Sequence, residues 1–443
     1  MPLLPSDLSP TRRQEILSAL RRGAVPNTGL DMLAVGLQRF EKSLDEELGH
    51  VATGQSSFKA VRGEYGTGKT FFVRWLEERA RRQGFATAEV QISETETPLH
   101  KLETVYRRAM ERLRTATTAT GALPDIVDGW FFTLENDVLS RSDVDSSDDE
   151  AVENAISTLM EQRLAAVTRR APQFAATLRA YHDAQRAGDF ATAQALLAWL
   201  SGQPNVGAAI KRRADLKGEI SHDVARSFLE GLLTVLQDSG VKGLVLVLDE
   251  VETLQRVRSD IRERSLNALR QLVDELYEGR FPGLFLVITG TPAFFDGPQG
   301  VQRSAPLAQR LHTDFSTDAR FDNPRAVQLR LSGFRQEQLV ELGRKIRDIF
   351  ADGAEHPERI RRLVDDTYVD DLANALAGQF GGQVRVAPRI FLKKLVADVL
   401  DRVELYEDFD PRQHYELTIT REELTPDEEA AVFGVDDIDL ELD

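Results

Sequence analysis

Eight residues, 63–70, have the types and spacing that bind a polyphosphate. They read Gly-Glu-Tyr-Gly-Thr-Gly-Lys-Thr, a GxxxxGKT pattern between an apolar stretch and a helical one. The glycines let backbone N–H groups wrap the phosphates, and the helix that follows directs its positive end at the same anion. We expect Lys69 to reach the β- and γ-phosphates and Thr70 to ligate Mg²⁺. The predicted nucleotide contacts in this stretch are Gly63, Glu64, Tyr65, Gly66, Thr67, Gly68, Lys69, Thr70 and Phe71.

An acidic pair, Asp249 and Glu250, directly follows the apolar run at residues 244–248. Such an unbroken run is typical of a strand buried on both faces, and carboxylates at its tip are costly unless a cation or polar site receives them. Asp249 is expected to hold the Mg²⁺ shell, and Glu250 to orient or activate the attacking water. The alternative is a strand that ends in a solvated acidic pair, and the presence of Lys69 argues against it.

Two threonines follow the next buried strand, at residues 284–288. A polar residue at this strand end would lie next to the γ-phosphate if the strands are neighbours. Thr291 is the first choice for this contact and Thr289 the second. For both, the alternative is a turn hydroxyl that caps a backbone group.

Arginines farther along the chain are candidates for action from a neighbouring subunit or from a lid. Arg310, Arg320 and Arg325 have a spacing suited to a subunit edge. An arginine that enters a neighbour's site stabilises the charge of the transition state, and Arg310 is the best candidate. Arg389 opens a late helix, from which it could report hydrolysis. A surface arginine and a structural ion pair are the respective alternatives.

Adenine contacts are predicted upstream of the phosphate loop. Residues 23–36 are apolar and rich in turn formers, so Val25, Pro26, Val35 and Gly36 are candidates. An ordinary packed connector is the alternative, because adenine contact has no strict sequence code.

The elements around these residues predict an α/β fold. A strand precedes the phosphate loop, a helix follows it, and residues 86–92 alternate like the next parallel strand. No strand pattern is visible from about 115 to 240. Helical patterns in this part occur at 151–167, 174–187, 191–200 and 222–237; after residue 333 they occur at 336–350, 365–377 and 388–403.

We therefore predict a P-loop NTPase sheet of the AAA+ type with helices on both faces, a helical insertion and a C-terminal α-helical lid. The predicted parts are an N-terminal, adenine-side segment (1–50), the ATPase core (51–330) with its insertion (about 115–240), the lid (331–405) and an acidic tail (406–443).

The composition of the chain limits the kinds of partner and the cellular compartment that we expect. The 443 residues carry a formal net charge of −17 and contain no cysteine, so disulfides and thiolate metal sites are excluded. We expect a cytoplasmic protein, because neither a leader pattern nor a long apolar run is visible.

The net charge repels nucleic acid, and the cluster of Lys211, Arg212, Arg213 and Lys217 is interpreted as a solvated face rather than a DNA site. Residues 425–443 contain no basic residue; a disordered tail or a docking strand for a basic surface is expected.

The order of these motifs resembles that of the AAA+ ATPases, nearest to the branch of origin-recognition and transposition regulators. More narrowly, most of residues 10–405 resembles the ATP-binding proteins of the BREX phage-defence systems, the BrxD-like family. The matching stretches are LRRGAVPNTGLDMLAVG, FKAVRGEYGTGKTFF, AGDFATAQALLAWLSG, KGLVLVLDEVETL, LFLVITGTPAFF and VRVAPRIFLKKLVADVLD. The resemblance implies an intracellular bacterial ATPase, encoded alongside a helicase and a modification or effector component. It also implies a sensor role for Thr291 and a second sensor role for Arg389 or Arg385.

Together, the residues and the resemblance predict an ATPase that converts ATP to ADP and phosphate with Mg²⁺. Its cycle would switch a homo-oligomer or a complex with other defence proteins, such as a helicase. We expect no membrane partner, and we expect any contact with DNA to be indirect. Two alternatives stay open: a nucleotide-dependent scaffold with little turnover, and a DNA-associated loader or initiator-like ATPase. A small-molecule kinase is disfavoured because no acceptor-pocket signature is visible.

Overall fold

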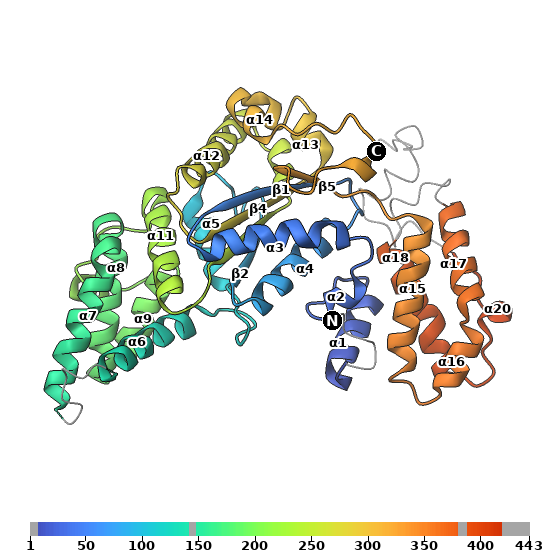
Figure 1. The fold of residues 1–443 in the computed structure, drawn as a ribbon, viewed down its shortest axis with the longest axis horizontal. Helices are drawn as coiled ribbons and strands as arrows, with labels where there is room; N and C mark the ends of the chain where they lie inside the picture. The colour runs from blue at the N-terminus through green and yellow to red at the C-terminus, as the bar shows by residue number, and fades with distance from the viewer. Residues whose placement is uncertain (1–7, 141–147, 380–387, 419–443) are drawn as a thin grey trace, which may run out of the picture. The chain divides into compact units, whose positions relative to one another are not determined.

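The fold contains a parallel five-stranded sheet (Figure 1). The computed structural model describes residues 8–140, 148–379 and 388–418. The strand order is β2-β3-β4-β1-β5, with β1 at Ser57–Arg62, β2 at Ala86–Gln91, β3 at Leu244–Asp249, β4 at Leu284–Gly290 and β5 at Gln328–Arg330. The strands β1, β3 and β4 are buried along their whole lengths. Burial on both faces explains the near-continuous apolar sequences of β3 and β4, whereas β1 also buries Lys59 and Arg62. The predicted α/β class with a parallel sheet is confirmed.

Register brings the tips of three strands to matching positions. The strands β2 and β3 pair in parallel with Gln91 opposite Asp249, and β3 and β4 pair in parallel with Leu248 opposite Ile288. The ends of the three strands therefore lie at one edge of the sheet, where side chains on the next residues can meet. The helix α3 (Gln38–Ala52) precedes β1. The helices between the strands of the sheet include α4 (Lys69–Arg82), α5 (Leu102–Glu111), α12 (Ser259–Tyr277), α13 (Pro292–Asp296) and α14 (Ala305–Leu311).

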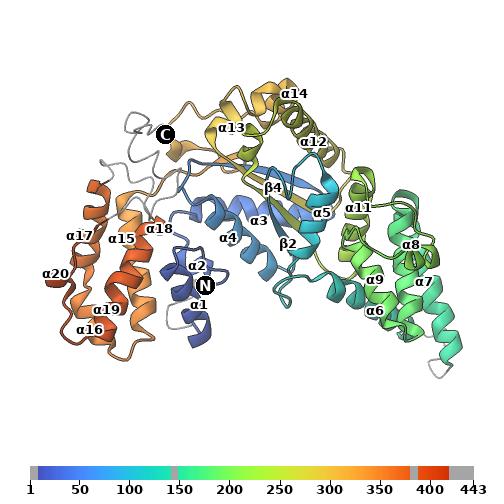
Figure 2. The ribbon, with the colours of Figure 1, turned by 180° about the vertical axis from the view of Figure 1, so that it is seen from behind.

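The long connection between β2 and β3, where the sequence predicts a helical insertion, consists of helices and loops in its described residues (Figure 2). Its helices are α6 (Leu123–Leu139), α7 (Asp149–Arg170), α8 (Pro172–Arg186), α9 (Phe190–Leu200), α10 (Ala208–Arg213) and α11 (His222–Asp238). Large rings fill its interior, with Trp130, Phe174, Tyr181, Trp199 and Phe228 all less than 2% exposed. The sequence patterns did not predict α6. Among the described residues of the insertion there is no strand.

The N-terminal helices share a hydrophobic core with the C-terminal ones. Ile16 and Leu20 of α1 (Pro10–Arg21) belong to the same buried cluster as Leu339 and Ile346 of α15 (Gln336–Ala351), and Arg21 makes two hydrogen bonds to Asp401, at 2.7 and 2.8 Å. The other elements of this group are α2 (Leu30–Leu33), α16 (Pro357–Leu363), α17 (Asp366–Gln379), α18 (Pro388–Lys393), a π-helical turn (Lys394–Leu400), α19 (Asp401–Leu405) and α20 (Pro411–His414).

The chain packs as two compact units that do not follow the sequence order. One unit contains Met1–Lys42, Val61–Glu78 and Asp314–Asp443; the other contains Ser43–Ala60 and Arg79–Thr313. These boundaries differ from the predicted divisions near residues 50 and 330, because the N-terminal helices pack with the C-terminal ones.

In the described part of the chain, no helix has both the length and the apolar character needed to cross a bilayer. Residues 425–443, for which a disordered or docking tail is predicted, lie outside the described residues, as does Arg385.

Candidate functional site

The phosphate loop occupies the turn between β1 and α4. Gly66 and Gly68 have φ angles of 77° and 91°, in the left-handed region that side chains other than glycine disfavour. The helix α4 begins at Lys69, directly after this turn, and Thr70 is its second residue. The predicted loop is thus a tight turn that opens a helix, the arrangement that presents backbone N–H groups to an anion.

Lys69 holds its ammonium group over the loop. Its Nζ atom donates to the carbonyl oxygens of Gly63, at 2.9 Å, and of Glu64, at 3.4 Å, and lies 4.9 Å from the centre of the Tyr65 ring. The side chain of Thr67 donates to the Glu64 carbonyl at 2.8 Å. Lys69 is buried, so water screens its charge less, and its attraction for a polyphosphate at the loop is stronger.

A cavity of about 290 Å³ adjoins the loop within the same unit. Its wall includes Thr67, Gly68 and Phe71 from the loop and α4, Val35 from the N-terminal segment, and Phe334 from the segment after β5. This volume lies near the lower end of the roughly 300–1,000 Å³ range of small-molecule sites. The apolar side chains beside a glycine-rich turn suit a flat, weakly polar base.

The predicted adenine contacts divide into two pairs. Val35 and Gly36 line the cavity. Val25 and Pro26 are not among its lining residues; the carbonyl oxygen of Val25 instead accepts a hydrogen bond from Arg74 of α4, at 3.2 Å. Only the first pair therefore shares a cavity with the loop.

Three guanidinium groups, those of Arg39, Arg320 and Arg335, also line this cavity. Arg39 donates to the carbonyl oxygens of Ala319, at 3.1 Å, and Arg330, at 2.8 Å. Burial is the main cause that lowers the pKa of Arg39. Asp318 also lines the cavity, so its charged residues carry a net positive charge, which favours an anionic ligand. Sequence reasoning missed Arg39 and Arg335, because isolated arginines carry no local pattern that marks a pocket.

A polar network joins the tips of β2, β3 and β4 in the other unit. The hydroxyl of Thr289 donates to the buried carboxylate of Asp249 and accepts a hydrogen bond from the backbone N–H of Glu250, at 3.0 Å. The side chain of Gln91, the last residue of β2, donates to the Glu250 carboxylate at 2.8 Å. The tip of β3 thus supplies two carboxylates: that of Asp249 is bonded from β4 and that of Glu250 from β2.

Glu250 has an unusual backbone conformation, with φ 59° and ψ 43°. Only Glu250 and Asp215 among the described non-glycine residues have positive φ angles. Such a conformation costs a residue other than glycine about 1–3 kcal/mol, and residues held in it cluster at functional sites. The backbone turn directs the chain away from the sheet while the carboxylate stays at the strand tip, bonded to Gln91.

Comparison with known families places the chain in one of them. The family model of the BREX system ATP-binding protein BrxC/D matches residues 8–419. The chain belongs to this family. No curated protein matches the chain. The predicted resemblance to the BREX ATP-binding proteins is therefore confirmed, whereas the relation to the origin-recognition branch stays a prediction.

Membership of the family makes the protein an ATP-binding component of a BREX-type defence system. It supports ATP as the ligand and suggests other BREX proteins as partners.

In this BREX protein, the two predicted threonines have different contacts. Thr289, the second choice, contacts Asp249 and Glu250, as described above. Thr291, the first choice, is the N-cap residue of α13, where its hydroxyl accepts from the Phe294 N–H at 3.4 Å. This cap is the alternative that the sequence left open for Thr291. The assignment of a sensor stays a prediction, and the contacts favour Thr289.

The predicted arginines lie in three settings. Arg310, in α14, forms an ion pair with Asp274 of α12, and Asp274 also pairs with Arg270 at 2.9 Å. Arg320 lines the cavity beside the phosphate loop, and Arg325 is exposed.

Arg389 is half-buried on α18, in the C-terminal helices. It approaches the end of α1 closely, because a Cβ atom at Gly23 would lie 3.4 Å from its Nη1 atom. The role of this arginine as a second sensor stays a prediction.

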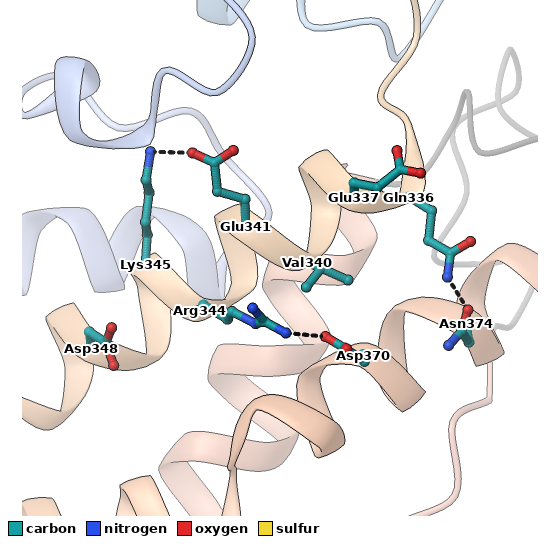
Figure 3. Close-up of a pocket in the computed structure, with 9 residues that line it drawn as sticks. All are labelled: Gln336, Glu337, Val340, Glu341, Arg344, Lys345, Asp348, Asp370 and Asn374. Carbon is teal, nitrogen blue, oxygen red and sulfur yellow. Dashed lines mark hydrogen bonds and ion pairs between the residues drawn. The ribbon is translucent and has the colours of Figure 1, made fainter.

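A larger cavity, of about 520 Å³, lies between α15 and α17 (Figure 3). Both of its basic side chains are paired with acidic ones of the same wall: Lys345 contacts Glu341 at 2.8 Å and Arg344 contacts Asp370 at 2.9 Å. The wall contains neither a glycine-rich turn nor an aromatic ring. Size alone therefore does not identify the nucleotide site of this BREX protein.

The basic cluster of the insertion has structural contacts. Lys211 donates to the Gly218 carbonyl at 3.0 Å and lies 4.5 Å from the centre of the Trp199 ring, and Arg213 pairs with Asp189 at 2.6 Å. These contacts agree with the interpretation as a solvated face and do not favour a DNA site.

Proposed function

We propose that this BREX protein is a Mg²⁺-dependent ATPase of the AAA+ type, whose cycle switches an oligomer or a complex with other defence proteins. The observation that carries the proposal is the strained conformation of Glu250 beside the anchored Asp249. A scaffold that only binds ATP has no need of a glutamate held in a costly backbone conformation. A hydrolase needs a carboxylate in a fixed place near the attacking water.

The proposed reaction is the in-line attack of water on the γ-phosphorus. A bond forms between the water oxygen and phosphorus, the bond to the β-phosphate oxygen breaks, and ADP leaves. Glu250 orients the water and accepts its proton, and Lys69 stabilises the charge on the phosphate oxygens. Such a reaction depends on positioning and charge neutralisation, which these side chains supply without a covalent intermediate.

The donor groups suit Mg²⁺ rather than a softer metal. The Thr70 hydroxyl and the Asp249 carboxylate are hard oxygen ligands, and the chain has no cysteine. No cluster of three or more histidine or acidic residues able to hold a metal occurs in the described ranges, which fits an ion held by few protein groups and by phosphates. When bound, Mg²⁺ would neutralise charge on the β- and γ-phosphate oxygens.

Glu250→Gln separates a hydrolase from a scaffold. The substitution keeps size and hydrogen bonding but removes the proton acceptor, so we expect steady-state ATP turnover to fall about 10²- to 10⁴-fold while ATP binding is retained. The matched control is Glu278→Gln, at the exposed end of α12, which should leave turnover unchanged. Wild-type turnover in Glu250→Gln, or no Mg²⁺-dependent turnover in the unaltered protein, would favour the scaffold.

The trans-acting role proposed for Arg310 requires an exchange of partners. The guanidinium would leave Asp274 and approach the nucleotide of a neighbouring subunit. Arg310→Ala should then reduce turnover without reducing ATP affinity, and only at concentrations at which the protein is oligomeric. Arg303→Ala is the matched control, because Arg303 also pairs with a carboxylate, Glu263, at 3.2 Å. Equal effects of the two substitutions would exclude this role.

A further inference from the structure

The helical insertion carries a second pocket, of about 290 Å³, formed by α6, α7 and α8. Its wall combines the rings of Phe131, Phe132, Tyr181 and His182 with the carboxylate of Glu135. The pocket results from three consecutive aromatic residues on α6. Successive residues of a helix point about 100° apart, so Phe131 and Phe132 cannot face the core in the same direction as the buried Trp130.

The rings form a continuous wall. Phe131 stacks against His182, with ring centres 4.9 Å apart, and against Tyr181, at 6.0 Å. Phe132 is 63% exposed, an unusual position for a large apolar side chain. Burial lowers the pKa of His182, so its ring is neutral near pH 7 and does not repel a cation.

Two carboxylates, Asp128 and Glu135, give the wall a negative charge. They lie seven residues apart on α6, which places them two turns apart on the same face. The Tyr181 hydroxyl donates to Asp128 at 2.5 Å, and burial together with this bond raises the pKa of Tyr181 to about 12, so the hydroxyl keeps its proton. The lining residues include no lysine or arginine, and the nearby Arg186 is paired with Glu153.

We propose that this pocket binds an arginine side chain from a basic segment of a partner protein. Aromatic faces attract cations, and a neighbouring carboxylate adds a charge-assisted hydrogen bond. Arginine fits better than lysine, since a planar guanidinium can stack on Phe132 while it bonds in a fork to a carboxylate. A nucleic acid does not fit, because Asp128 and Glu135 would repel its phosphates.

The charge of the chain favours a basic partner. The C-terminal residues 425–443 contain no lysine or arginine and cannot supply the cation. The whole chain has a net charge of −17, which favours association with a basic surface. The inference does not depend on ATP hydrolysis, because it concerns residues of the insertion alone.

Overlapping 15-residue peptides that tile the other proteins of the same BREX system would test the proposal on the full-length protein. We expect at least one arginine-containing peptide to bind, and replacement of its arginine by citrulline to abolish binding. Phe132→Ser should weaken this binding roughly tenfold, and the double variant Asp128→Asn, Glu135→Gln should weaken it at least as much.

Phe190→Ser is the matched control, because Phe190 is an equally exposed phenylalanine of the insertion, at 64%, outside the pocket. It should leave peptide binding unchanged, and all variants should keep the ATP affinity of the unaltered protein. The proposal is wrong if no peptide binds in a Phe132-dependent way, or if the bound peptides lack arginine. It is also wrong if Phe132→Ser instead dissociates an oligomer, since the occupant would then be a second copy of the chain.

Discussion

Two turns of this protein use the left-handed backbone region in different ways. In the phosphate loop, Gly66 and Gly68 adopt φ angles of 77° and 91°, which cost glycine no steric energy. After β3, Glu250 adopts φ 59° at a cost of about 1–3 kcal/mol. The loop offers backbone N–H groups to a ligand and needs no side chain at its turns. The strand tip offers a carboxylate, so glycine cannot replace the residue that makes the turn.

Among the variants that test this comparison, Glu250→Gly should have the largest effect. Glycine fits the backbone of the turn but removes the carboxylate, so ATP turnover should fall about 10²- to 10⁴-fold. The free energy of unfolding should change by less than about 1 kcal/mol, because relief of strain offsets the greater chain entropy of glycine. Turnover assays and urea unfolding would measure the two effects. A variant that unfolds readily would show that Glu250 has mainly a structural role.

Lys69→Ala tests the loop side of the comparison. The substitution removes a charged donor from the loop, and we expect ATP affinity to fall about 10- to 150-fold, corresponding to roughly 1.5–3 kcal/mol. Lys101→Ala, at an exposed lysine, is the control and should bind ATP normally. Titration calorimetry would measure both. Unchanged affinity in Lys69→Ala would place the nucleotide elsewhere.

Thr289→Val and Thr291→Val, compared with each other, would show which of the two threonines acts as the sensor at the strand tip. Loss of the Thr289 hydroxyl leaves the buried Asp249 carboxylate without this donor, a cost of about 1–3 kcal/mol, so turnover should fall roughly 5- to 150-fold. Loss of the Thr291 hydroxyl removes a helix cap, so it should lower the free energy of unfolding by about 1 kcal/mol and affect turnover less. The reverse order of effects on turnover would restore Thr291 as the sensor.

Gly68→Ala should have the smallest effect of the four. A methyl group at Gly68 would meet only ordinary contacts, 3.9 Å or more away, so the strain comes from the positive φ angle. We expect the free energy of unfolding to fall by about 1–2 kcal/mol, with weaker ATP binding. Gly49→Ala is the control, because Gly49 lies within the helix α3 and should be neutral or stabilised. Equal stability of the two variants would contradict the comparison.

Local patterns in the sequence predicted the elements that carry these groups. The glycine spacing before Lys69 predicted a turn that opens a helix, and the apolar run before Asp249 predicted a buried strand. The helical patterns of the insertion were also found, except for the short α10 and for α6, where three consecutive aromatic residues obscure the period. These features were predictable because the residues that determine them are neighbours along the chain.

The sequence by itself thus determined the α/β class, the phosphate-loop turn, the buried acidic strand and the resemblance to the BREX family. Only the tertiary structure decided that Thr289 rather than Thr291 contacts Asp249, that Arg39 and Arg335 line the cavity with Val35, and that the N-terminal helices share a core with the C-terminal ones. Such contacts join residues far apart in the chain. They depend on strand register and on how apolar faces are buried together, which short-range spacing does not encode.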